Sequence, residues 1–136
     1  MKIKLILLAS LFAVGFAMSA TAGSVTDTDG DGVPDVFDNC LNVPNGPAET
    51  PNNQVDTDMD GFGNACDGDF NNSFTPVDVN DFLLFLADIG NPNTSQFDLN
   101  ADGTTTVNDF LAFLQLIGGP PGPSGLGCAG SVPCTI

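Results

Sequence analysis

The chain has 136 residues, of which 17 are acidic and two are basic, and it contains no His, Trp or Tyr. Its formal net charge of −15 excludes nucleic acids and anionic lipids as partners, because both are bound through Lys and Arg side chains. The lack of His also excludes Ser–His and Cys–His catalytic pairs and imidazole zinc sites.

Residues 1–22 have the features of a secretory signal peptide. Lys2 and Lys4 precede an apolar run from Leu5 to Ala17, and the small residues Ala-Thr-Ala follow at 20–22. The apolar run is shorter than the roughly 20 residues that a membrane helix needs. We therefore expect cleavage after residue 22. The mature chain would then be secreted, extracellular or at the cell surface, without membrane insertion and without any cationic side chain.

Two segments of the first half place short oxygen-bearing side chains at positions 1, 3, 5, 9 and 12, with Gly at position 6. This is the ligand pattern of a calcium loop, in which position 7 contributes its backbone carbonyl. In loop 1, residues 27–38, the predicted ligands are Asp27, Asp29, Asp31, the carbonyl of Val33, Asp35 and Asp38. In loop 2, residues 56–67, they are Asp56, Asp58, Asp60, the carbonyl of Phe62, Asn64 and Asp67. Calcium is favoured over magnesium, because magnesium dehydrates reluctantly and seldom accepts an all-protein cage.

These segments resemble the thrombospondin type 3 repeat. The similarity is carried by DVFDNC at 35–40 and by QVDTDMDGFGNACD at 54–67. The resemblance implies a fold in which the chain wraps around calcium ions, is stapled by disulfides and has almost no apolar core. It also implies the ligand sets given above for loops 1 and 2, and therefore Ca²⁺ as the cofactor.

Four cysteines in an exported chain indicate two disulfides, for which three connectivities exist. We favour pairing Cys40 with Cys66 and Cys128 with Cys134. The first pair closes a segment without a helix, and the second forms a small C-terminal loop. Zinc ligation by the thiols is the alternative, but it is disfavoured by their scatter and by the lack of His.

The second half contains an internal repeat with an offset of 28 residues. Residues 77–90 read VDVNDFLLFLADIG and residues 105–118 read TTVNDFLAFLQLIG. Each copy has the pattern of a loop that leads into an amphipathic helix. We expect the first helix over about 79–89 and the second to end before Gly118.

Each of these helices follows a further oxygen-rich loop. In loop 4, residues 98–109, the predicted ligands are Asp98, Asn100, Asp102, the carbonyl of Thr104, Thr106 and Asp109. In loop 3, residues 69–81, they are Asp69, Asn71, Ser73, Asp78 and Asp81. Loop 3 is one residue longer and lacks the Gly, so we expect it to bind calcium more weakly than loop 4, or not at all.

Residues from about 67 to 118 resemble a dockerin-type, EF-hand-like module. This resemblance implies two calcium loops that each lead into one helix, with the helices packed antiparallel. It also implies a cohesin-type protein partner. The partner would contact loop positions 10 and 11, which are Val79, Asn80, Val107 and Asn108.

The predicted fold class is mostly irregular, calcium-wrapped loops stapled by a disulfide, followed by a small all-α, dockerin-like pair of loop–helix units. After the signal peptide, the predicted segments are the thrombospondin type 3-like region at 23–68, the loop–helix pair at 69–118 and a Gly/Pro linker with a Cys loop at 119–136. We expect the Phe and Leu side chains of the two helices to form the only core. The surplus apolar side chains expected to stay exposed as a partner surface are Leu83, Leu84, Leu111 and Ala112.

The predicted function is that of a secreted, non-enzymatic calcium-binding protein that serves as a spacer or in docking or cell adhesion. Calcium would supply most of the stability, because the first half has too few apolar residues to offset the entropy of ordering the chain. The alternative is a small hydrolase, of the glycosidase or aspartic type, that uses an Asp pair. It is disfavoured because nearly every Asp belongs to a calcium loop, and Glu49 and Asp88, which do not, are isolated.

Overall fold

The computed structural model describes residues 25–49, 53–92 and 95–135, so the predicted signal peptide lies outside the described residues. The regular elements are a short 3₁₀ helix, η1 (Asp35–Phe37), and the α-helices α2 (Val79–Asp88) and α3 (Val107–Leu116). No strand occurs in the described ranges, whose other residues form turns and loops. The predicted combination of irregular loops and two small helices is therefore confirmed. In the same ranges, neither α-helix has the length and apolar character needed to cross a membrane.

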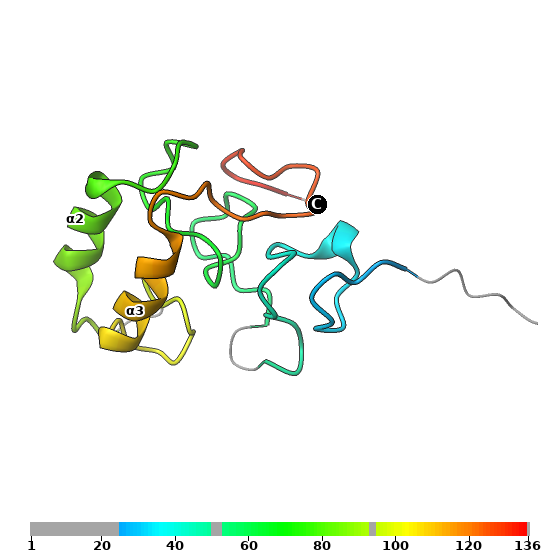
Figure 1. The fold of residues 1–136 in the computed structure, drawn as a ribbon, viewed down its shortest axis with the longest axis horizontal. Coiled ribbons are helices and arrows are strands. Elements are labelled where there is room, and N and C mark those ends of the chain that lie inside the picture. Colours follow the sequence, from blue (N-terminus) through cyan, green and yellow to red (C-terminus); the bar gives the residue numbers. More distant parts are fainter. Residues whose placement is uncertain (1–24, 50–52, 93–94, 136) are drawn as a thin grey trace, which may run out of the picture.

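The two α-helices lie side by side and run in opposite directions at one end of the molecule (Figure 1). Each begins with a capping box. The side chain of Asp78 caps α2, and Asp81 in turn accepts the N–H of Asp78 at 2.9 Å. Thr106 and Asp109 do the same for α3, at 2.8 Å. The capping boxes satisfy N–H groups that the first helical turn leaves free, so the last residues of loops 3 and 4 also set where the helices start.

The hydrophobic core lies between these helices and the loops around them. One phenylalanine of each helix, Phe85 and Phe113, is fully buried, and their rings stack with centroids 5.4 Å apart. Phe70 of loop 3 stacks on Phe113 with centroids 5.3 Å apart. The buried cluster consists of Phe70, Val77, Phe85, Leu99 and Phe113.

The expectation that the helices alone form the core needs correction. Three of the five buried core side chains come from loops, because a ten-residue helix turns only a narrow face toward its neighbour. The predicted exposed residues Leu83, Leu84 and Leu111 are indeed 58%, 40% and 56% exposed. Ala112 differs, since it is half-buried against the core.

The C-terminal segment runs back from α3 across the irregular part of the protein (Figure 1, orange to red). The sequence predicted a Gly/Pro linker here, but the segment is joined to the rest of the protein by backbone hydrogen bonds along its length. Four of these bonds, in chain order, are Val77 N–H to Gly119 O at 2.9 Å, Gly122 N–H to Cys66 O at 3.2 Å, Gly125 N–H to Asp38 O at 2.8 Å and Gly130 N–H to Asp60 O at 2.9 Å. The segment therefore fastens loops 1 and 2 to the helical end.

All four cysteines are paired as the sequence analysis favoured. Cys40 and Cys66 are 26 residues apart in the chain, with Cα atoms 5.7 Å apart, and both are buried. Cys128 and Cys134 are six residues apart, with Cα atoms 5.1 Å apart. Since no cysteine is free, the zinc alternative is wrong.

Candidate metal centres

The four oxygen-rich loops share one backbone conformation. In each loop, the residues at positions 4 and 6 have positive φ angles, which L-residues other than Gly adopt only at a cost. The pairs and their φ angles are Gly30 and Gly32 (79° and 91°), Met59 and Gly61 (60° and 92°), Asn72 and Phe74 (52° and 54°), and Ala101 and Gly103 (54° and 95°). Loop 3 therefore makes the same turn as the others although it lacks the Gly at position 6.

The same hydrogen bonds recur inside the loops. The carboxylate at position 1 accepts the N–H of position 6, with distances of 3.1 Å for Asp27, 3.0 Å for Asp56, 2.6 Å for Asp69 and 2.8 Å for Asp98. The side chain at position 5 accepts the N–H of position 7, with distances of 2.8 Å for Asp31, 2.8 Å for Asp60, 3.4 Å for Ser73 and 3.1 Å for Asp102. Backbone donors thus hold the side chains of positions 1 and 5 on the concave side of each loop.

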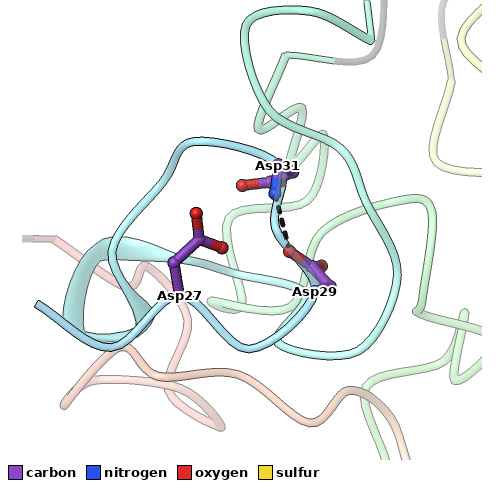
Figure 2. Close-up of side chains that lie close together, drawn as sticks. All are labelled: Asp27, Asp29 and Asp31. Atoms are coloured by element: carbon purple, nitrogen blue, oxygen red, sulfur yellow. Dashed lines mark hydrogen bonds between the residues drawn. The ribbon is translucent and has the colours of Figure 1, made fainter.

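In loop 1, the carboxylates of Asp27, Asp29 and Asp31 converge (Figure 2). Oxygen atoms of the three lie within 4.8 Å of one another. Asp29 Oδ2 and Asp38 Oδ2 are buried and have no hydrogen-bond partner among the described residues, and Asp38 is fully buried. Burial also raises the pKa of Asp29, and its carboxylate neighbours raise it further. Buried anionic oxygens without donors are costly, and a bound cation would remove that cost.

Loop 2 repeats this arrangement. Oxygen atoms of Asp56, Asp58 and Asp60 lie within 4.8 Å of one another. Asp58 Oδ2 and Asp60 Oδ2 are buried without a partner in the described part of the chain, and Asp60 is fully buried. The last residue, Asp67, is buried too and accepts the N–H of Asp69 at 2.9 Å. The donor set is all oxygen and strongly anionic, which suits calcium.

The position 9 residues of loops 1 and 2 have partners within their own loops. Asp35 accepts both the N–H and the hydroxyl of Thr28, at 2.8 and 2.9 Å. Asn64 accepts the N–H of Thr57 and donates its amide N–H to the Thr57 hydroxyl, both at 2.9 Å. In this structure both predicted ligands therefore fasten position 9 of the loop to position 2.

In loops 3 and 4, by contrast, the carboxylates are satisfied by local donors. Asp81 accepts the backbone and side-chain N–H groups of Asn71, at 3.3 and 2.7 Å. Asp109 accepts the N–H of Asn100 at 3.2 Å and the hydroxyl of Thr106 at 3.2 Å. Within the described ranges, every buried carboxylate oxygen without a partner belongs to loop 1 or loop 2. The structural case for a metal ion is therefore strongest in those two loops.

A buried amide cluster connects loop 1 to the segment before loop 2, and sequence reasoning missed it. The N–H of Asn45 donates to Asp31 Oδ2 at 2.9 Å, and the Asn45 amide donates to Asn39 at 2.8 Å. Gln54 donates to both Asp38 and Asn45, at 2.9 and 2.6 Å. These amides orient carboxylates of loop 1 from outside the loop. The only sequence signal was the abundance of Asn and Gln between the two loops.

Asp88, which the sequence left unassigned, has a structural role at the end of α2. Its carboxylate accepts hydrogen bonds from Asn91, Ser95 and Thr105, each between 2.8 and 2.9 Å. Burial alone would raise the pKa of Asp88, but these three hydrogen bonds outweigh it and lower the pKa below 3.8. Because Thr105 lies in loop 4, Asp88 joins the two loop–helix units.

Calcium binding at loop 2 is expected to release protons near neutral pH. Burial, together with repulsion from neighbouring Asp side chains, outweighs the lowering effect of a backbone hydrogen bond and raises the pKa of Asp60 from 3.8 to about 6 and that of Asp67 to about 8. The metal-free fold therefore holds protons that the unfolded chain has lost, so its stability falls as pH rises from 3.8 to about 6 for Asp60 and from 3.8 to about 8 for Asp67. Calcium displaces the same protons. Calorimetric titration at about pH 6.5 in two buffers of different ionisation enthalpy measures the release. Equal binding heats in both buffers would contradict this expectation.

Among known protein families, a similarity was found for one segment in the first half of the chain. No similar curated protein and no similar solved structure was found. A family model of the thrombospondin type 3 repeat, a calcium-binding and non-enzymatic repeat of extracellular proteins, matches residues 26–47. These residues contain the whole of loop 1 together with Asn39, Cys40 and Asn45, which contact it or follow it.

Proposed function

We propose that this chain is an exported, non-enzymatic calcium-binding protein whose loops 1 and 2 each hold a calcium ion and fold around it. The observation that carries the proposal is the set of buried carboxylate oxygens that have no partner in the described residues, namely those of Asp29, Asp38, Asp58 and Asp60. The mature chain contains no cationic side chain to compensate them, because both Lys residues lie in the predicted signal peptide. A divalent cation supplies the missing positive charge.

Loops 3 and 4 are proposed as further calcium sites of unequal strength. Both have the backbone turn of loops 1 and 2. Each loop offers three carboxylates, but loop 3 is one residue longer, has Phe74 in place of the Gly at position 6 and has the uncharged Ser73 at position 5. Loop 4 keeps the regular spacing of a calcium loop, so it is proposed as the stronger of the two.

The helix pair is the proposed docking surface, with a cohesin-type protein as the partner that the dockerin resemblance suggests. Residues related by the 28-residue repeat are exposed to nearly the same extent. Val79 and Val107 are 64% and 61% exposed, and Leu83 and Leu111 are 58% and 56% exposed. Matching apolar side chains on both helices offer a partner two similar surfaces.

Isothermal titration of the metal-free protein with calcium tests the proposed function. We expect at least two ions per chain, with dissociation constants of about 1 mM or tighter, and little competition from magnesium at similar concentration. Glu49→Gln is a suitable control, because Glu49 is exposed and lies outside the loops. If the wild-type protein took up no calcium at millimolar concentration, the proposal would fail.

A further inference from the structure

A side chain of loop 3, that of Asn72, reaches a carboxylate of loop 2. The Oδ1 atom of Asn72 is buried and has no hydrogen-bond partner among the described residues. The Asn72 side chain faces the carboxylate of Asp58, to which its amide N–H donates. Asp58 Oδ2 and Asp60 Oδ2 are likewise buried and have no partner within the described ranges. The two neighbouring loops therefore present three buried acceptor oxygens without a donor. Such a group is unfavourable unless a cation joins it.

The place of Asn72 in its own loop does not account for this oxygen. Asn72 is residue 4 of loop 3, whereas a calcium loop takes its ligands from positions 1, 3, 5, 7, 9 and 12. The equivalent residues of the other loops are Gly30, Met59 and Ala101, which have no side-chain oxygen. With a φ of 52°, Asn72 adopts a left-handed conformation that Asn tolerates better than most residues.

The C-terminal cystine loop, residues 128–134, covers another side of loop 2. Gly130 donates its N–H to the carbonyl of Asp60 at 2.9 Å. A Cβ atom on Gly61 would lie 2.7 Å from Ala129 Cα and 2.7 Å from Cys134 Sγ, so the two loops are in direct backbone contact. A Cβ on Gly130 would in turn lie 3.9 Å from the Phe74 ring. Loop 2 is thus enclosed by loop 3 and by the cystine loop, which leaves Asn72 Oδ1 shielded from water.

From this arrangement we infer that Asn72 is a ligand of the calcium ion held by loop 2. The inference rests on the proposed function and adds a ligand that the loop 2 sequence does not contain. The ion then binds residues on both sides of Gly68, which is the only residue between loops 2 and 3. Calcium at loop 2 therefore fixes the first loop–helix unit against the irregular half of the protein.

The test is calcium titration of Asn72→Gly, which removes the side chain and permits the positive φ. One class of site should weaken by about tenfold, while Asn72→Asp, which restores an oxygen, should bind at least as tightly as wild type. Ala101→Gly is the matched control, because it makes the same backbone change at position 4 of loop 4 without removing an oxygen, and it should weaken no site. Circular dichroism of each calcium-loaded variant verifies that the helices are retained.

A background in which loop 2 no longer takes up calcium, Asp56→Asn combined with Asp60→Asn, identifies the site concerned. If Asn72 serves loop 2, Asn72→Gly has no further effect on calcium binding in that background. Unchanged affinities in Asn72→Gly alone, or a loss that persists in full in that background, would overturn the inference while the calcium function stands. Failure of the wild-type protein to bind calcium would instead remove the proposed function itself.

Discussion

Replacing Cys40 and Cys66 with Ser is expected to lower the free energy of unfolding of the calcium-loaded protein by about 3.5 kcal/mol. The two cysteines are 26 residues apart, and in the unfolded chain their bond restricts a loop of that length. The described residues from Cys40 to Cys66 contain no helix, and their only buried hydrophobic side chains are the two cysteines themselves. Apart from bound metal and hydrogen bonds, little else stabilises this half of the protein, so the disulfide contributes a large part of its free energy of unfolding.

Chemical denaturation at saturating calcium measures the effect. The matched control is replacement of Cys128 and Cys134 with Ser. That bond closes a segment of six residues, so its loss should cost only about 2 kcal/mol in the same chain-entropy relation. Equal losses in the two double variants, or no loss in the first, would show that the Cys40–Cys66 bond is not a main support of the first half.

Asp60→Asn is expected to have opposite effects with and without calcium. In the metal-free protein, the substitution removes a buried carboxyl group, and burial raises the pKa of this group to about 6. Above that pH the wild-type protein must bury a negative charge, so the variant should be more stable than wild type. With calcium, it removes a charged ligand and weakens one site by at least about tenfold. At a calcium concentration far above the dissociation constants of both the wild type and the variant, a tenfold loss of affinity lowers the free energy of unfolding by about 1.4 kcal/mol.

Thermal unfolding in chelator and in excess calcium measures both the expected stabilisation and the expected destabilisation. The backbone should be preserved, because Asn at this position still accepts the N–H of Phe62, which donates to Asp60 at 2.8 Å. Glu49→Gln removes one charge away from the loops and serves as the control. If Asp60→Asn lowered the stability equally in both conditions, Asp60 would be a structural residue and not a ligand.

The local structure of this protein was largely readable from its sequence. The helix over 79–89 ends within one residue of the observed end of α2, because capping residues and apolar spacing act locally. The carboxylates of Asp27, Asp29 and Asp31 converge because Asp occupies every second position and because the chain turns at Gly32. These features depend on residues within a dozen positions of one another, which is the range over which sequence patterns are informative.

Contacts between distant segments could not be predicted in the same way. The hydrogen bonds of Gly125 to Asp38 and of Gly130 to Asp60 join residues that no local pattern relates. The burial of Phe70 and Leu99 in the core, and the contact of Asn72 with Asp58, depend on how the loops fold over one another. Asn72 also occupies a loop position that is not a ligand position, so the loop pattern gave no reason to consider it.

The central claim is that bound calcium gives the first half of this protein its shape. Small-angle scattering before and after exhaustive chelation tests it most directly. With calcium, the mature chain should have a radius of gyration of about 13 Å, as expected of a compact chain of this length. After chelation, with the disulfides intact, the radius should increase clearly because the buried carboxylates repel one another. An unchanged radius in the chelated protein would contradict the account.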